Sequence, residues 1–213
     1  MTAGPTREAI DPVRYISNRS SGKMGYAVAA AGVEQNHEVT LISGPVALSA
    51  PAGARLVNVT SAAEMAAAVM EHFTGCDVLV MAAAVADWRP VHPGTQKIKK
   101  SDQRMTLELE PTEDILLKIL PMKSAQLVIG FAAETQNLLE EARRKLVRKE
   151  LDLMVANDVS RTDAGFEVDM NEVVFIERDG ETRQLPFMPK VEVARHLVKW
   201  VEDRIVKKSK KII

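Results

Sequence analysis

Short apolar runs alternate with stretches of helical spacing along the chain, and this alternation constrains the fold more than any other feature. Runs such as Val78-Leu79-Val80-Met81 are continuously apolar, which is typical of strands in a sheet covered on both faces. Strand and helix in repetition predict an α/β fold, a Rossmann-like parallel sheet with helices on both faces. Strands are expected over residues 38–43, 55–59, 77–82, 126–131 and 151–156, and helices over 22–35, 62–73, 113–120, 135–149 and 189–206.

Two segments depart from this alternation. Residues 86–110 contain Pro and Gly, then a lysine cluster, and then an alternating stretch at 105–109 that is typical of a strand. Residues 172–185 are typical of a β-hairpin with Asp179-Gly180 at its tight turn. Because both lie outside the β-α pattern, we expect residues 86–110 and 171–186 to form a small additional β element, either a subdomain or a contact in a homodimer.

Size and charge limit the kinds of partner. The 213 residues are expected to form one domain over residues 1–213, since two independent cores need a longer chain. A formal net charge of -1 does not indicate a basic surface, so the lysine-rich residues 207–211 are interpreted as a solvated tail. We expect small-molecule partners and no nucleic acid.

The ends and the single cysteine bear on location. Cys76 forms no internal disulfide, and neither a signal segment nor a run of about eighteen apolar residues appears. A cytoplasmic protein without membrane association is predicted. The first residues, Met1-Thr2-Ala3-Gly4, enter a turn with no apolar strand ahead of it. We therefore expect the chain to be part of a longer one whose preceding segment supplies most of the first strand.

Ligands of open parallel sheets bind beyond the carboxyl ends of the strands, so the loops there are candidate sites. The first loop contains Gly4 and leads through Asn18 to Ser20, Ser21 and Gly22. A serine that caps a helix near Gly22 would point the positive end of the helix dipole at a phosphate. The alternative is an ordinary capped helix with glycines for close packing. Neither Gly-x-Gly-x-x-Gly nor a Walker pattern is present, which disfavours a plain dinucleotide oxidoreductase and a Walker-type nucleotidase.

Two further segments carry candidate groups for the same site. Ala83 and Ala84 leave room for a flat ligand at the end of the most apolar strand, and Asp87 can accept hydrogen bonds from a ribose or a base. Core packing for the alanines and an ordinary turn for Asp87 are the alternatives. The run Lys97-Ile98-Lys99-Lys100 is suited to neutralising phosphate from a mobile loop, although such runs are usually solvated surface.

The fourth segment joins a strand end to a helix. Phe131 can stack on a base, and Lys145 and Lys149 lie four residues apart on one helix face, where they can meet phosphate. Core packing and a solvated face are the alternatives. The four histidines are scattered without metal-ligand spacing or a Ser/His/Asp pattern, so neither a zinc site nor a hydrolytic triad is supported.

Several motifs in order along the chain resemble one family, the phosphopantothenoylcysteine synthetases. The resemblance covers nearly the whole chain, and its specificity lies in the combination. The matching segments are Thr2-Ala3-Gly4-Pro5-Thr6-Arg7-Glu8, Asp11-Pro12-Val13-Arg14, Asn18-Arg19-Ser20-Ser21-Gly22-Lys23-Met24-Gly25, Ala83-Ala84-Val85-Ala86-Asp87, Lys97-Ile98-Lys99-Lys100, Gly130-Phe131-Ala132-Ala133-Glu134-Thr135 and Ala156-Asn157-Asp158.

The resemblance implies an activity. Bacterial members use CTP, with Mg²⁺ for the triphosphate, to convert 4'-phosphopantothenate into an acyl-cytidylate. L-cysteine then displaces CMP in the amide-forming step of coenzyme A synthesis. The members are homodimers, often fused to a phosphopantothenoylcysteine decarboxylase domain that carries FMN, which is expected on that separate domain and not here.

The resemblance also implies residue roles. Lys97 matches a lysine that assists cytidylyl transfer, and Asn18 matches an asparagine that acts on the acyl-cytidylate as an amide donor to the oxyanion. The metal ligands are not identified. The nucleotide-binding positions implied are Gly4, Ser20, Ser21, Gly22, Ala83, Ala84, Asp87, Lys97, Glu113, Asp114, Ile115, Leu116, Phe131, Lys145 and Lys149.

One departure and two rival functions remain. Residues 110–114 read Glu-Pro-Thr-Glu-Asp where relatives often have Asn-Pro-Asp, so the nucleotide contacts there are less certain than those of Asp87. A nicotinamide-dependent reductase on the same sheet is disfavoured by the missing glycine fingerprint. A non-catalytic nucleotide-binding module is the second rival, and the sequence does not exclude it.

Overall fold

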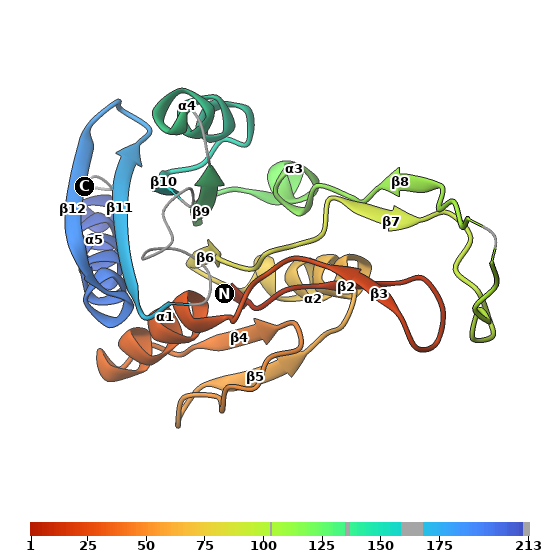
Figure 1. Ribbon diagram of the computed structural model, residues 1–213. Coiled ribbons are helices and arrows are strands. Elements are labelled where there is room, and N and C mark those ends of the chain that lie inside the picture. The colour runs from red at the N-terminus through yellow and green to blue at the C-terminus, as the bar shows by residue number, and fades with distance from the viewer. Residues whose placement is uncertain (103, 135–136, 159–167, 211–213) are drawn as a thin grey trace.

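An eight-stranded sheet dominates the computed structural model, which describes residues 1–102, 104–134, 137–158 and 168–210 (Figure 1). The strands lie in the order β12-β11-β10-β9-β6-β1-β4-β5. Their bounds are β1 Thr2–Ala3, β4 Thr40–Ser43, β5 Arg55–Asn58, β6 Val78–Met81, β9 Leu127–Glu134, β10 Leu153–Asp158, β11 Met170–Glu177 and β12 Thr182–Pro189. The helices are α1 Lys23–Glu34, α2 Ala62–Phe73, α3 Ile115–Ile119, the 3-10 turn Leu120–Met122, α4 Leu138–Arg148 and α5 Lys190–Lys210.

Six of these strands are parallel and follow the Rossmann order. Counted along the chain, β1, β4, β5, β6, β9 and β10 occupy the spatial order 3-2-1-4-5-6. Strand β1 lies at the centre, where Thr2 pairs with Ile42 of β4 on one side and Met81 of β6 on the other. The direction of winding reverses between β1 and β6, and in such sheets a ligand crevice opens at that reversal.

Helices cover both faces of the sheet, as the continuously apolar strands predict. Helices α1 and α5 pack on one face, through Val28 and Leu197 among others, while α2, α3 and α4 pack on the other through Met65, Ile119 and Leu146. All five of these side chains are almost fully buried. The predicted α/β, Rossmann-like fold class is therefore confirmed. No helix in the described ranges is long and apolar enough to cross a membrane.

The predicted hairpin at 171–186 is present but does not form a subdomain. Its strands β11 and β12 extend the main sheet, because β11 pairs antiparallel with β10 from Leu153↔Glu177 onward. Alternate residues of β11, including Val173 and Phe175, are buried beneath α5. The hydrophobic face of the hairpin thus completes the core, and a subdomain was the wrong expectation. Its part in a dimer contact stays a prediction.

The segment at 86–110 forms an arm that projects from the sheet (Figure 1). Strand β7, Trp88–Pro90, pairs antiparallel with β8, Leu109–Pro111, beside a hairpin of β2, Arg7–Ala9, and β3, Tyr15–Ser17. The strand expected at 105–109 was therefore placed too early, and β2, β3 and β7 were not predicted. Short paired strands of mixed polarity have no apolar periodicity to reveal them.

Helix boundaries also moved at three points. Helix α3 begins at Ile115 and not at 113, because the Asp114 carboxylate accepts the N–H of Leu117 as a cap. Helix α4 begins at Leu138, and the first two residues of its predicted span lie outside the described residues. Helix α5 extends to Lys210, but the side chains of the predicted solvated tail at 207–211 are not described.

Replacing Gly25 by alanine is expected to destabilise the fold, because α1 crosses β1 in close contact at this glycine. An added Cβ would lie 2.5 Å from Ala3 Cβ and 2.9 Å from the carbonyl oxygen of Thr2. Overpacking of this kind costs about 1–3 kcal/mol or more of unfolding free energy. Chemical denaturation measures the loss, with Gly75→Ala, where an added Cβ meets nothing within 4 Å, as the matched control. Equal stabilities of the two variants would contradict the packing argument.

Candidate functional site

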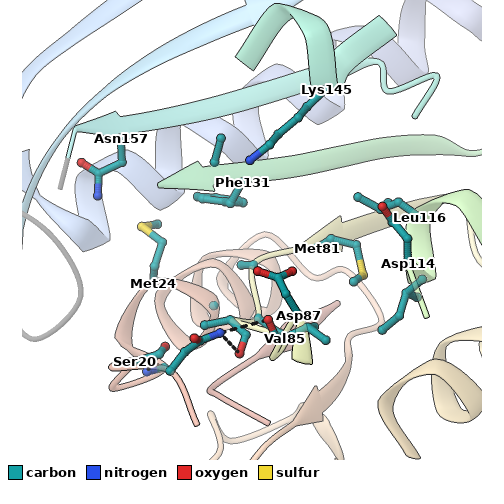
Figure 2. A pocket seen from close by; sticks show the side chains of 18 of the residues that line it. Ser20, Met24, Met81, Val85, Asp87, Asp114, Leu116, Phe131, Lys145 and Asn157 are labelled. Carbon is teal, nitrogen blue, oxygen red and sulfur yellow. Dashed lines mark hydrogen bonds between the residues drawn. The ribbon is translucent and has the colours of Figure 1, made fainter. Parts of the chain in front are cut away.

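A pocket of about 610 Å³ opens at the carboxyl edge of the parallel strands, beside the reversal between β1 and β6. Its volume lies within the range that small-molecule sites occupy, about 300–1,000 Å³. Figure 2 shows Phe131 and Lys145 on one side of it and Asp87 on the other. The start of α1 and the end of β10 close the far end, where Ser20, Met24 and Asn157 lie.

Helix α1 begins at this pocket. Within the described residues, no side chain caps the backbone N–H groups of its first turn. The cap residue is Gly22 itself, in a left-handed conformation with φ of 77°. A serine cap was the wrong expectation, since Ser20 Oγ only accepts the N–H of Gly22, at 3.4 Å. Uncapped N–H groups and the helix dipole together favour an anion at this end.

Gly4 and Gly22 allow the close packing that brings α1 to this position. Both have positive φ, and a Cβ added to either would come within 2.9 Å of Val46 Cγ1. A Cβ on Gly22 would also lie 3.4 Å from the backbone of Gly4. Gly4 is buried beneath the pocket and does not line it. Its contribution is therefore the backbone turn and the space above it.

Asn18 contacts the neighbouring loop through its amide nitrogen. Nδ2 donates to the carbonyl oxygens of Ala84 at 3.2 Å and Val85 at 2.9 Å, shown as dashed lines in Figure 2. Two carbonyl acceptors fix the orientation of the amide, since its oxygen would be repelled there. Both N–H groups are thereby engaged, and Oδ1 is the atom that Asn18 offers to a ligand.

The segment 84–87 forms one wall of the pocket and is held from both sides. Thr6 donates its backbone N–H to the Ala84 carbonyl, at 3.3 Å, and its hydroxyl oxygen accepts the N–H of Ala86, at 2.9 Å. From the other side, Thr112 donates its backbone N–H to the Asp87 carbonyl at 2.9 Å and its hydroxyl to the Ala86 carbonyl. The exposed Asp87 side chain therefore stands on a fixed backbone.

Opposite this wall, charged residues of α3 and α4 meet at one end of the pocket. Asp114 forms ion pairs with Lys149, at 2.9 Å, and with Arg148, at 3.3 Å. Lys145, one turn earlier on α4, lines the pocket as well, beside Phe131 of β9. An aromatic ring, two lysines and a carboxylate provide stacking and hydrogen-bonding groups for a nucleotide base and its sugar.

The opposite end of the pocket holds a second set of cations. Lys23 Nζ pairs with Asp169 at 2.7 Å, and Lys190, which is 5% exposed, donates to the Val168 carbonyl. The pKa of Lys190 is lowered to about 8, mainly by burial and then by the charge of Lys23, while Asp169 acts in the opposite direction. The hydrogen bond from Lys23 lowers the pKa of Asp169. Two lysines thus share one carboxylate at this end.

Most of the residues predicted from the sequence come together here. Lys97 does not: it is exposed on the projecting arm and is absent from the lining of the pocket. Ser21 and Gly4 also fall outside the lining. The predicted residues that line the pocket are Asn18, Ser20, Gly22, Ala83, Ala84, Asp87, Glu113, Asp114, Ile115, Leu116, Phe131, Lys145 and Lys149.

Sequence reasoning did not assign several of the polar lining residues to the site, among them Lys23, Asn157, Asn171 and Lys190. Asn157 belongs to a motif that was noted, but no role was drawn from it. Asn171 and Lys190 come from the antiparallel edge, whose position beside the parallel strands the pattern did not predict. A buried asparagine or lysine within an otherwise apolar strand-helix unit is the signal that points to them.

The pocket also suits a magnesium ion carried by a nucleotide. Mg²⁺ is usually held by one or two carboxylates together with substrate phosphates. Asp114 is engaged by Lys149 and Arg148, and Glu113 is engaged by Lys118 at 2.6 Å. Asp87 is the lining carboxylate that fits best, because it is exposed at the pocket and its backbone is fixed.

Comparison with known proteins gives consistent matches. A family model described as "DNA/pantothenate metabolism flavoprotein C-terminal domain" matches residues 1–205. The chain is 50% identical over 195 residues to the coenzyme A biosynthesis bifunctional protein CoaBC of Bacillus subtilis (strain 168), covering 91% of this chain and 48% of that protein. It is 42% identical over 215 residues to the CoaBC protein of Escherichia coli (strain K12), covering 99% of this chain and 53% of that protein.

A solved structure agrees with these relatives. The crystal structure of the C-terminal domain of a CoaBC protein superposes with a TM-score of 0.83 at 44% identity, covering 97% of this chain and 94% of that one. The chain spans about half the length of the curated relatives it matches. The family resemblance inferred from the motifs is confirmed. This chain belongs to the family of DNA/pantothenate metabolism flavoprotein C-terminal domains.

Proposed function

We propose that this chain joins 4'-phosphopantothenate to L-cysteine at the expense of CTP, forming 4'-phosphopantothenoylcysteine, CMP and pyrophosphate in coenzyme A synthesis. One observation carries the proposal. A single pocket brings together the uncapped start of α1, the amide of Asn18 and the side chains of Phe131, Lys145 and Lys149. The names of the relatives, which are coenzyme A biosynthesis proteins, support this reading.

The reaction proceeds in two steps. The carboxylate of 4'-phosphopantothenate attacks the α-phosphorus of CTP, and the bond to pyrophosphate breaks. The acyl carbon of the resulting 4'-phosphopantothenoyl-CMP is then attacked by the cysteine amine. Its bond to the CMP oxygen breaks, CMP leaves with the electron pair, and the nitrogen loses a proton. Mg²⁺, when bound, offsets charge on the triphosphate.

The pocket supplies groups for the nucleotide at both ends. Phe131 stacks on the base and Asp114 accepts hydrogen bonds from the base and the ribose, while Asp87 would hold the Mg²⁺ ion of the triphosphate. The positive charges of Lys145 and Lys149 offset the charge of the α-phosphate, and the backbone N–H groups after Gly22 bind the β- and γ-phosphates. Ser20, the alanines 83 and 84, and the residues Glu113, Ile115 and Leu116 complete the walls.

Asn18 acts on the second step through its oxygen. The amide donor role that the family resemblance implies requires a free N–H, but both N–H groups are directed at the carbonyls of Ala84 and Val85. In this proposal Oδ1 instead accepts a hydrogen bond from the cysteine amine. Such a bond orients the nitrogen lone pair toward the acyl carbon and stabilises the positive charge that develops on nitrogen.

Lys97 requires a second copy of this chain. Lys97 lies on the arm, outside the pocket of its own chain. The arm is held to the β2-β3 turn by two hydrogen bonds at Ile98: Arg14 donates to its carbonyl oxygen, at 2.9 Å, and Asp11 accepts its N–H, at 3.1 Å. An arm that projects from the sheet can reach the pocket of a neighbouring molecule. We propose a homodimer in which residues 86–110 and 171–186 form the contact and Lys97 assists cytidylyl transfer in the partner's pocket.

An assay with the four nucleoside triphosphates tests the function. Pyrophosphate release should require CTP and 4'-phosphopantothenate together, and CMP release should further require L-cysteine. Binding of CTP without turnover would favour a non-catalytic nucleotide-binding module. Binding of NADPH or NADH in a titration would favour a reductase. In its native context the domain is expected beside a decarboxylase domain that carries FMN, so the isolated chain should show the ligase reaction without flavin.

A further inference from the structure

The end of the pocket opposite Asp114, where Asn157 lies, contains polar groups that no step above uses. Asn171 is 3% exposed, and its Oδ1 is buried without a hydrogen-bond partner in the described part of the chain. Oδ1 of Asn157 is also buried without a hydrogen-bond partner among the described residues. Both residues line the pocket together with Lys23 and Lys190. A buried amide oxygen without a partner is unfavourable, which indicates that a ligand or its water shell meets these groups.

The charges at this end are suited to an anion. Lys23 and Lys190 are close enough for the charge of one to lower the pKa of the other, and Asp169 is the counter-ion that acts on both. Of the charged groups given for this end in the described residues, two are lysines and one is a carboxylate, a balance that favours an anionic ligand. Burying a second ammonium group beside the first is unfavourable unless an anion joins them.

We propose that Lys23, Lys190, Asn157 and Asn171 form a phosphate subsite at the end of the pocket beside the first turn of α1. The lysines bind phosphate oxygens as point charges, and an asparagine amide can turn to donate an N–H or accept from a water bound to the phosphate or its metal ion. The subsite rests on the proposed function for its choice of ligand, the terminal phosphates of the nucleoside triphosphate that become pyrophosphate.

Its position supports this source of phosphate. Lys23 is the first residue of α1 and lines the same pocket as Lys190, Phe131 and Lys145. A nucleotide that stacks on Phe131 would extend its triphosphate toward the start of α1, where Lys23 and Lys190 would meet the terminal phosphates. The other source of the same chemistry is the 4'-phosphate of the acid substrate, which the experiment separates.

The test measures binding by calorimetry, with Mg²⁺ present, for CTP against CMP and for 4'-phosphopantothenate against pantothenate. Lys190→Gln is expected to weaken CTP binding by about 10- to 100-fold and to leave CMP nearly unchanged. Lys23→Gln, at a residue whose side chain is 34% exposed, should act in the same direction and guards against misfolding of the first variant. Lys199→Gln, an exposed position on the same helix α5, is the matched control.

Each outcome has a defined meaning. A loss confined to 4'-phosphopantothenate would keep the phosphate subsite and move its ligand to the acid substrate. Unchanged affinity for all four ligands in folded Lys190→Gln and Lys23→Gln would overturn the subsite. Failure of the unmodified chain to bind CTP would instead overturn the proposed function. Thermal melting of each variant identifies those that fail to fold.

The pH dependence gives a second readout. The pKa of Lys190, lowered to about 8 mainly by burial, means that this lysine loses its proton above that pH in the free pocket, while a bound phosphate would hold the proton. Affinity for CTP should therefore be constant below pH 8 and fall as the pH rises above it. Lys190→Arg keeps its charge at all these pH values and should remove the fall. The same fall in both proteins would contradict the role of Lys190.

Discussion

Asn18→Asp is expected to lower the rate of amide formation by about 10²- to 10³-fold, a typical effect of removing one positioned hydrogen-bonding group from a reacting centre. The new carboxylate has no N–H to donate, so it would be repelled by the carbonyl oxygens of Ala84 and Val85, which Nδ2 contacts at 3.2 and 2.9 Å. The side chain would turn away and the acceptor for the cysteine amine would be lost. Quenched-flow analysis with labelled CTP should show the acyl-cytidylate accumulating.

The control for this variant is Asn58→Asp, the same substitution at an exposed position at the end of β5. It should leave both half-reactions unchanged. Two results would count against the assignment of Asn18: normal turnover in Asn18→Asp, or a loss of pyrophosphate release as large as the loss of amide formation. The second result would place Asn18 in the nucleotidyl-transfer step.

Lys97→Gln is expected to abolish the first half-reaction, with pyrophosphate release falling by at least about 10²-fold because a positive charge no longer offsets charge at phosphorus. CTP binding should change much less, since the nucleotide keeps its contacts with Phe131, Asp114 and the start of α1. Pyrophosphate release and equilibrium CTP binding are the two measurements. Lys100→Gln, an exposed lysine in the same cluster, is the control and should keep full activity.

Mixing Lys97→Gln with Asn18→Asp tests where Lys97 acts. If it acts in the partner's pocket, each mixed dimer contains one pocket with both wild-type residues. An equal mixture should then recover about a quarter of wild-type activity, since half of the dimers are mixed and each has one intact site. If Lys97 served its own chain, every pocket would lack one residue and no activity would return.

The alternation of strands and helices was enough to predict the sheet, because six parallel strands need apolar residues on both faces. It also predicted which loops share one edge, and this placed Asn18, Asp87 and Phe131 around one pocket. Strand β1, with two residues, carries no pattern of its own and is defined only by its pairing with β4 and β6.

Other features depend on contacts that local sequence does not contain. The left-handed Gly22 cap replaced the predicted serine cap because Gly4 and Val46 leave no room for a Cβ there. Lys190 and Asn171 reach the pocket only because the β11-β12 hairpin pairs with β10. A hairpin predicts its own turn but not the edge to which it adds, so these residues could not be placed from the sequence.

The hydrogen bonds on both sides of residues 84–87 fix this segment at the base of the arm. Strand β7 of the arm begins at Trp88, directly after this segment, so a contact that restrains the arm also restrains this wall of the pocket. A second molecule that binds the arm would therefore stabilise the loop that carries Asp87. Ligand affinity should then rise with protein concentration, because dimer formation and ligand binding both stabilise residues 84–87.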